Sequence, residues 1–310
     1  WQAHNMGRTN SRLIRIQASA FTSPPIGNIS SSNVSEFPEY LQVDPGELGS
    51  GTPVRVDVAG NKEAVAKHFA QALFDEFSTK PTSTVILPVG PVDQFPILAG
   101  MINDRGLDCR DIMIINMDEY LAGDESWIPI DHPLSFRGFM NRMFYDRLHK
   151  ELAPAPANRI FPAPLKESRI RELIDRRGGL DSCYGGIGIN GHIAFNEPPE
   201  PGERPNRDAF ASLPTRVLSI TRETRTINAN TVGGDISIIP PRAITVGMRE
   251  ILGAGRLRFY CNRPWQSAVV RRVLHGPITP HCPASFLRTH PDATITVADY
   301  VAEPPDIRLR

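Results

Sequence analysis

The sequence lacks several features that would each indicate a class of protein. Its four cysteines are far apart and form no CxxC pair, so neither a zinc site nor a disulfide framework is indicated. No apolar run approaches the roughly 20 residues that span a bilayer, and no signal-peptide pattern is visible. We therefore expect a cytoplasmic protein with reduced thiols, no metal site and no membrane partner.

An excess of charge of either sign is also missing. Lys plus Arg and Asp plus Glu both total 34 among the 310 residues, so the formal net charge is zero. Bulk charge therefore does not favour a nucleic-acid or acidic-membrane partner. The chain is long enough to bury a sizeable core, and we expect its ligand to be a small molecule.

The chain divides into an irregular beginning and a regular remainder. Residues 1–52 are rich in Ser, Asn, Pro and Gly and show no sustained periodicity, which predicts an irregular N-terminal extension. From 53 to 310, β-branched runs alternate with segments of helical spacing, a pattern typical of parallel βαβ units. We predict a single Rossmann-like α/β domain over 53–310, with a mainly parallel sheet flanked by helices.

The expected elements follow from these local patterns. Strands are predicted at 54–58, 84–87, 112–116, 159–162, 183–187, 216–221, 243–246, 257–261 and 293–301. Helices are predicted at 63–77, 95–101, 132–149, 170–173 and 266–274.

The stretch 185–198, GGIGINGHIAFNEP, holds the densest polar chemistry. His192 has an unperturbed pKa near 6.5, so it can exchange protons at neutral pH. Glu197 can fold back to orient the imidazole, and glycines such as Gly191 allow close approach of the backbone to a ligand. A lone histidine beside a glycine turn is more often structural, so these residues alone leave both roles open.

Asp118 and Glu119 directly follow the expected strand 112–116. Ligands of parallel α/β sheets bind at the carboxyl ends of the strands, so at least one carboxylate should face the same crevice as His192. One interpretation is a general base whose pKa is raised in a partly desolvated cleft. The other is a helix N-cap, for which Asp is a preferred residue. Spacing does not choose between them.

Four segments in this order resemble the glucosamine-6-phosphate deaminase/isomerase family. They are INMDEYLAG at 115–123, HPLSFRGFM at 132–140, GIGINGHIAFNEP at 186–198 and IPPRAITVGM at 239–248. The related 6-phosphogluconolactonases share the glycine-histidine turn but usually lack the following AFNEP. The resemblance runs from about residue 53 to the C-terminus.

The resemblance implies an enzyme without a metal or organic cofactor. Such an enzyme opens an amino-sugar phosphate ring, moves a proton between C2 and C1 through an enolic intermediate, and releases ammonia. Asp118 matches the carboxylate that moves the proton, His192 the acid/base for ring opening, and Glu197 the carboxylate that orients the histidine. Each positioned acid or base is typically worth ~10² to 10⁴ in rate.

The catalytic segment departs from the family at one position. Asn190 stands where the family has Asp, two residues before the histidine. An asparagine keeps the size and can hydrogen-bond, but it cannot accept a proton. Because a neighbouring anion is lost, we expect a lower pKa for His192 and a slower or differently arranged ring opening.

The phosphate loop departs further. Where the family has a T/S-G-G-T/S loop that cradles phosphate at a helix N-terminus, this chain reads Val89, Gly90, Pro91 and Val92. Both hydroxyls are gone and proline has no N–H to donate. Asp93 follows, and we expect it to bring negative charge close to the phosphate position.

Two cationic positions of the family also fall on neutral residues, Asn230 and Gln266. A phosphate dianion needs several charge-assisted hydrogen bonds, so an unphosphorylated or otherwise altered sugar is one interpretation. The other is that an arginine at 222, 225, 242 or 263 restores phosphate binding. We expect the substrate site to be lined by Val89, Gly90, Pro91, Val92, Glu119, Gly191, Asn230 and Gln266.

The sequence thus favours a sugar isomerase/deaminase that acts on an amino sugar or amino-sugar phosphate. A catalytically reduced sugar-binding or regulatory protein is the alternative that Asn190 and the altered loop support, although a binder does not require Asp118, His192 and Glu197. A lactonase-like hydrolase is disfavoured by the AFNEP and MDEY segments. The sequence leaves open whether the chain forms a homo-oligomer.

Overall fold

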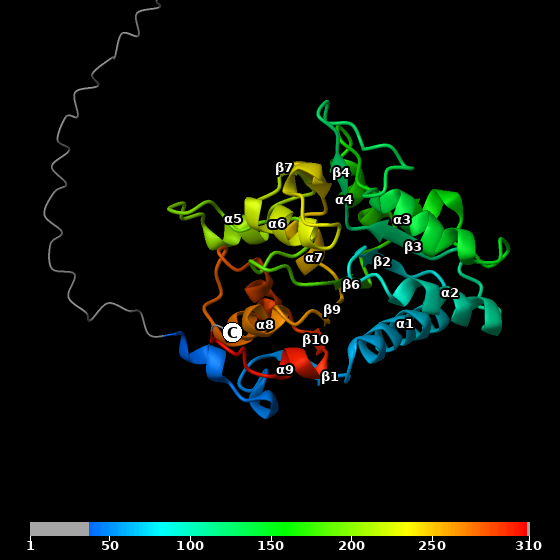
Figure 1. Cartoon of the computed structure of the whole chain (residues 1–310). Helices are drawn as coiled ribbons and strands as arrows, with labels where there is room; N and C mark the ends of the chain where they lie inside the picture. Colours follow the sequence, from blue (N-terminus) through cyan, green and yellow to red (C-terminus); the bar gives the residue numbers. More distant parts are fainter. Residues whose placement is uncertain (1–36, 309–310) are drawn as a thin grey trace, which may run out of the picture. The chain divides into compact units, whose positions relative to one another are not determined.

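A computed structural model describes residues 37–308 of the chain (Figure 1). From Pro38 onward these residues form one compact unit. It contains a seven-stranded sheet and a separate three-stranded sheet. The prediction of an α/β fold with a mainly parallel sheet flanked by helices is confirmed.

The main sheet has the strand order β1-β10-β9-β6-β2-β3-β5, and every neighbouring pair is parallel. All of its strands therefore end at one edge of the sheet. Strands β2, β3 and β6 are buried at every residue, as expected for a parallel sheet covered on both faces. The bounds are β1 Val54–Val58, β2 Thr84–Leu87, β3 Met113–Asn116, β5 Arg159–Ile160, β6 Ser182–Gly185, β9 Arg256–Cys261 and β10 Ala293–Val297.

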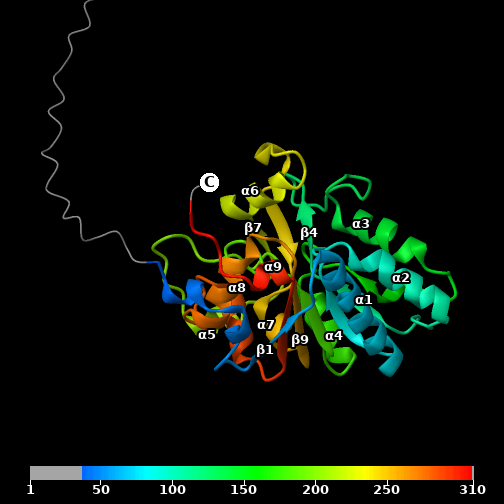
Figure 2. The same ribbon diagram turned by 60° about the horizontal axis from the view of Figure 1, so that its bottom comes forward.

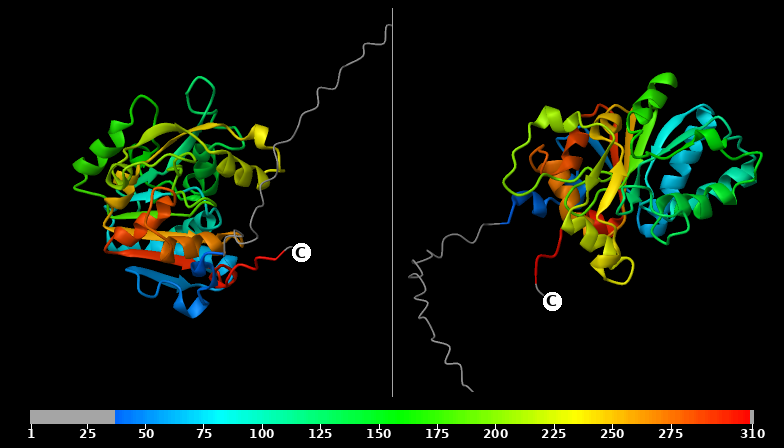
Figure 3. Two further views of the ribbon diagram at one scale, coloured as in Figure 1. Left: turned by 90° about the vertical axis from the view of Figure 1, so that its left-hand side faces the viewer. Right: turned by 90° about the horizontal axis from the view of Figure 1, so that it is seen from above.

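Helices cover both faces of this sheet, with α1 and α2 on one side and α8 and α9 on the other (Figures 2 and 3). Helix α1 buries Val65, Phe69, Leu73 and Phe77, which is the apolar stripe that the spacing predicts. The bounds of the helices are α1 Lys62–Thr79, α2 Gln94–Arg105, α3 Phe136–Met143, α4 Ser168–Arg176, α5 Arg207–Ala211, α6 Arg222–Asn230, α7 Met248–Leu252, α8 Gln266–His275 and α9 Asp299–Ala302.

The small antiparallel sheet has the order β4-β8-β7, with β4 Asp118–Leu121, β7 Arg216–Ser219 and β8 Arg242–Thr245. The chain passes into it directly from β3. The Met117 N–H donates to the Leu87 carbonyl of the main sheet, and the Met117 carbonyl accepts from Val246 N–H, both at 2.9 Å. Asp118 therefore begins a strand at the carboxyl end of β3, and the helix N-cap interpretation of Asp118 is wrong.

Two expected elements end well before the sequence pattern does. The helix expected over 132–149 is limited to α3, because Phe144 leaves helical geometry and a 3₁₀ turn at Tyr145–Arg147 follows. The strand expected over 293–301 ends at Val297, and the chain then turns at Ala298 into α9. Apolar residues beyond both ends are still buried, Leu148 in the first case and Val301 in the second, so an apolar pattern does not mark where the element stops.

The compact unit begins earlier than the predicted boundary at residue 53. Short 3₁₀ helices form at Glu39–Gln42 and Pro45–Glu47, and Leu48 is buried in the main core. Short 3₁₀ turns have no periodicity that a sequence pattern could reveal. Residues 1–36 of the predicted extension lie outside the described residues.

All four cysteines have free thiols and are buried. Within residues 37–308, no helix is both long and apolar enough to cross a membrane. No group of three or more His, Cys, Asp or Glu side chains is gathered for a metal ion in the same part of the chain.

Candidate active site

A cleft of about 420 Å³ opens at the carboxyl ends of β2, β3, β6 and β9. Its walls come from the segments that follow these strands, and from α6. This is where parallel α/β sheets bind their ligands. The segments are 88–92 after β2, 117–118 after β3, 186–188 with His192 after β6, and 262–266 after β9.

Asp118 lines the cleft as the first residue of β4. Only 7% of its surface is exposed. Burial, and to a lesser extent the neighbouring charge of Glu119, raise the pKa of Asp118 well above its ordinary value. A carboxyl group in this setting can hold and release a proton closer to neutral pH than an exposed aspartate.

Glu119 was predicted to line the substrate site, but the structure places it elsewhere. Successive side chains of a strand point to opposite faces, and the fully buried Glu119 carboxylate faces the start of α3. It accepts hydrogen bonds from Ser135 Oγ at 3.0 Å, from Phe136 N–H at 3.0 Å and from Arg137 N–H at 2.9 Å. Glu119 therefore stabilises the N-terminus of α3. It affects Asp118 only through its charge, which helps to raise the pKa of Asp118.

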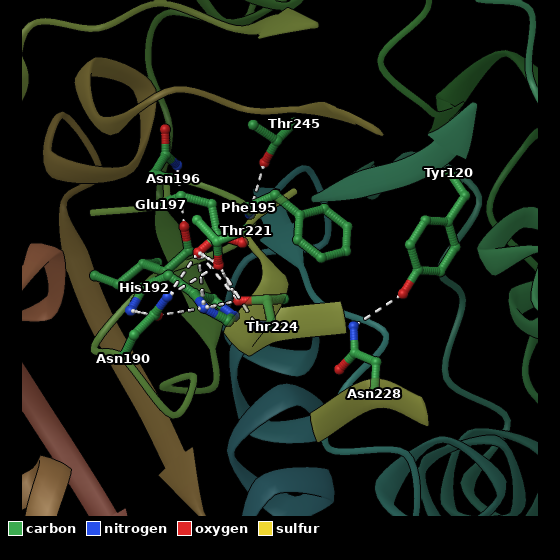
Figure 4. A network of polar contacts seen from close by, with 11 residues as sticks. Tyr120, Asn190, His192, Phe195, Asn196, Glu197, Thr221, Thr224, Asn228 and Thr245 are labelled. Carbon is green, nitrogen blue, oxygen red and sulfur yellow. Dashed lines mark hydrogen bonds and ion pairs between the residues drawn. The ribbon is translucent and has the colours of Figure 1, made fainter. Parts of the chain in front are cut away.

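The structure brings together Asn190, His192 and Glu197 (Figure 4). Asn190 Oδ1 lies 2.8 Å from His192 Nδ1, and Asn190 Nδ2 donates to Glu197 Oε2 at 2.9 Å. Glu197 Oε2 also lies 3.5 Å from His192 Nδ1. Thr221 and Thr224, at the start of α6, donate to the same carboxylate oxygen at 3.2 and 3.0 Å.

These contacts define the tautomer of the histidine. Asn190 Oδ1 accepts from the His192 backbone N–H at 3.2 Å and its amide nitrogen donates to Glu197, so the amide orientation is fixed. Nδ1 must then carry the proton that is donated to Oδ1. Within residues 37–308, Nε2 has no hydrogen-bond partner, so it is the ring nitrogen left to accept a proton from a ligand.

Burial lowers the pKa of His192, and the charge of Glu197 partly opposes this. Because burial is the cause of the lowered pKa, the expectation that Asn190 lowers it stays a prediction. The imidazole packs directly on Gly188, where a Cβ would lie 2.0 Å from Cε1 of His192. Any larger residue at position 188 would displace the ring.

Gly191 was predicted to contact the substrate, but it faces away from the cleft. Its φ is +89°, which favours glycine. A Cβ at this position would lie 2.7 Å from the Cys282 sulfur. Gly191 therefore allows the turn before His192 to pack against the core, and it has no place in the cleft wall.

The loop residues Val89, Gly90, Pro91 and Val92 line the cleft. The expectation that Asp93 adds negative charge there is wrong. Asp93 Oδ2 lies 2.8 Å from Lys62 Nζ, on the first turn of α1, and Asp93 is not part of the cleft wall. The loop is thus poor in side-chain donors, but it is not made anionic.

Asn230 and Gln266 also line the cleft. The Gln266 amide is already engaged, because Nε2 donates to the Ile187 carbonyl and Oε1 accepts from the Arg263 N–H, both at 2.8 Å. Its main role is therefore to hold the turn after β9 against the segment after β6.

Several lining or supporting residues were missed by sequence reasoning. They include Tyr120, Thr221, Thr224, Asn228 and Asn262. Asn262 directly follows an apolar strand, a signal like the one that identified Asp118. The threonines carry no such signal, because only the fold brings α6 to Glu197.

The arginines considered for a phosphate differ in their placement. Arg225 donates to the Ile236 carbonyl at 3.1 Å, and Arg242 pairs with Glu125. Arg222 is exposed and does not contribute to the cleft wall. Among the described residues, only Arg263 presents an arginine to the cleft.

A parallel α/β sheet with a buried carboxyl group and a hydrogen-bonded histidine at its carboxyl edge defines an α/β enzyme built for proton transfer on a small substrate. No protein-family model matches the chain. The glucosamine-6-phosphate deaminase of Thermoanaerobacter pseudethanolicus is 30% identical over 250 residues, covering 79% of this chain and 92% of that protein. The chain belongs to the glucosamine-6-phosphate deaminase family and is an enzyme of this type.

Other comparisons agree with this assignment. The glucosamine-6-phosphate deaminase of Rhodopirellula baltica is 28% identical over 268 residues, covering 84% of this chain and 100% of that protein. A solved structure of a monomeric glucosamine-6-phosphate deaminase superposes with a TM-score of 0.68 at 26% identity, covering 80% of this chain and 99% of that chain. The 6-phosphogluconolactonase of Thermotoga maritima shares the fold, with a TM-score of 0.57 at 16% identity over 79% of this chain and 100% of that chain.

Proposed function

We propose that this chain isomerises and deaminates an amino-sugar phosphate. Ring opening exposes the C1 aldehyde, a proton moves from C2 to C1, and the resulting imine at C2 is hydrolysed to a ketone and ammonia. The observation that carries this proposal is the buried Asp118 in the same cleft as the His192 network. The names of the curated relatives support the substrate class.

Asp118 is the base that removes the C2 proton and returns it to C1. Its raised pKa suits this task, because the same carboxyl group must be ionised to accept the proton and protonated to deliver it.

His192 takes the proton of the C1 hydroxyl at Nε2 and passes it to the ring oxygen as the bond between C1 and that oxygen breaks. When the His192 imidazole becomes imidazolium, its positive charge is compensated by Glu197, whose Oε2 lies 3.5 Å from Nδ1. Asn190 supplies the hydrogen bond that sets the tautomer and links the imidazole to the carboxylate. The three residues thus act as one proton-transfer unit.

The far end of the substrate meets a remodelled subsite. The segment 89–92 offers backbone groups and apolar surface in place of hydroxyls, and Asn230 and Gln266 are neutral. The substrate is a small sugar, and neither a nucleic acid nor a membrane is part of the proposal. Cytoplasmic localisation, homo-oligomerisation and the N-terminal extension stay predictions from the sequence.

Solvent deuterium exchange at C2 and release of ammonia test the proposal. We expect both with glucosamine 6-phosphate, and we expect Asp118→Asn to reduce them by ~10² to 10⁴. The matched control is Asp175→Asn, an exposed aspartate paired with Arg171 on α4. Sugar binding without exchange or ammonia would instead favour a catalytically reduced binding protein, the alternative that Asn190 supports.

A further inference from the structure

The cleft contains a buried amide that lacks a partner. Asn262, directly after β9, is 4% exposed, and its Nδ2 has no hydrogen-bond partner within residues 37–308. Its backbone is fixed, because the Tyr300 hydroxyl donates to the Asn262 carbonyl at 2.6 Å. A buried donor without an acceptor is costly and rare. Since Asn262 is part of the cleft wall, a ligand oxygen is the natural partner for this donor.

The next residue adds a positive charge to the same wall. Arg263 is half-buried and lines the cleft. Its backbone N–H is bonded to Gln266 Oε1, whereas its guanidinium has no hydrogen bond or ion pair within the described part of the chain. A guanidinium presents a fork of N–H donors that matches the oxygens of a phosphate.

Nothing in the facing wall cancels this charge. The segment 88–92 contains no charged side chain, and Asp93 is paired with Lys62. Among the residues that line the cleft, the acidic group is Asp118. Within the cleft wall, Asp118 is therefore the carboxylate that could repel an oxyanion placed against Arg263.

The strand order separates the donors from the proton-transfer end. Strands β9 and β3 are three spacings apart, with β6 and β2 between them, which is about 14 Å at the usual strand spacing. Side chains reach into this gap from both ends, from Asn262 and Arg263 on one side and from Asp118 on the other. A hexose that reacts at C1 and C2 and carries an anion at C6 has its two functional ends separated in the same way.

We propose that Asn262 and Arg263 bind the substrate phosphate and make the enzyme selective for the phosphorylated sugar. This inference rests on the proposed function and names the residues that determine its substrate. The positive charge that the family alignment places at Gln266 is supplied here from the preceding turn. The loop 89–92 then contributes shape and backbone contacts.

Calorimetry on the full chain carrying Asp118→Asn tests the inference without turnover. We expect glucosamine 6-phosphate to bind at least ~10-fold more tightly than glucosamine. Adding Arg263→Met should weaken binding of the phosphate ester ~10- to 100-fold and leave binding of glucosamine unchanged. Arg263→Lys should restore part of the loss, and Arg222→Met, an exposed arginine outside the cleft wall, should have no effect.

Two results would overturn the inference: equal binding of the two sugars, or a preference for the phosphate ester that survives Arg263→Met. Asn262→Leu is a second test, because it removes the buried donor without changing the charge. We expect it to weaken binding of the phosphate ester and leave binding of glucosamine unchanged. If the preference depends on Arg263 but the wild-type chain releases no ammonia, the anion site stands and the proposed function fails. If ammonia is released and Arg263 is irrelevant, only the anion site is rejected.

Discussion

Asp118 lies where the fold supports its negative charge poorly. It is almost fully buried, and Glu119 is its neighbour in the chain. Both conditions raise the pKa of Asp118, so the folded chain binds this proton more tightly than the unfolded chain does. Ionisation of Asp118 therefore destabilises the fold, and the property that suits proton transfer is opposed to stability.

Asp118→Asn should accordingly raise the free energy of unfolding near pH 8. The contribution of a group with a raised pKa is fully present below its unfolded pKa, about 4, and is lost as pH rises through the folded pKa. The advantage of the variant should therefore grow from pH 5 to pH 8, as measured by urea denaturation. Asp175→Asn should show no such trend, and a variant that is destabilised equally at every pH would contradict the argument.

Asn190 controls the proton on His192 through a neutral contact of 2.8 Å. Asn190→Asp would place a carboxylate against Nδ1 and raise the pKa of His192 from its lowered value. The limb of the kcat/KM profile that reports His192 should therefore move to higher pH. Asn228→Asp adds the same charge to the cleft wall away from the imidazole and should move the limb less. An unmoved limb in Asn190→Asp would show that His192 does not determine it.

At the scale of elements, local periodicity predicted the helices and strands whose buried residues follow a local pattern. The stripe of α1 was found because its spacing decides which face is buried, and β2 and β3 were found because strands buried on both faces read as continuous apolar runs. The end of the predicted helix 132–149 and the small sheet were not found. The small sheet and the start of α3 depend on contacts across the chain, such as the Met117 hydrogen bonds and the Glu119 carboxylate at Phe136 N–H.

For the candidate site too, residues marked by a local pattern were predictable, and residues that only the fold brings to the site were not. Asn190, His192 and Glu197 lie within one short segment, and Asp118 directly follows a strand, so sequence and family resemblance indicate them. Asn262 and Thr224 belong to the site only because β9 lies beside β6 and α6 packs over Glu197. The order of strands in a sheet differs from their order in the chain, and no local pattern reports it.

At the scale of the whole molecule, one buried arginine joins the two ends of the compact unit. Arg271 of α8 is fully buried and donates to the Val43 carbonyl at 2.8 Å. The same guanidinium donates to the carbonyls of Ala302 and Glu303 near the C-terminus. Residues 38–52 therefore contribute to the stability of the domain, although their sequence predicts an irregular lead-in.

Two truncated chains test this connection, one that begins at Pro38 and one that begins at Pro53. The shorter chain loses Leu48 from the core and leaves the Arg271 guanidinium without its Val43 acceptor, so we expect its free energy of unfolding to be lower by ~3 to 5 kcal/mol. Denaturant unfolding measures the difference. Arg271→Met should destabilise the longer chain more than the shorter one, because its partner is absent in the latter. Equal stability of the two chains, or equal effects of Arg271→Met, would show that the domain does begin near residue 53.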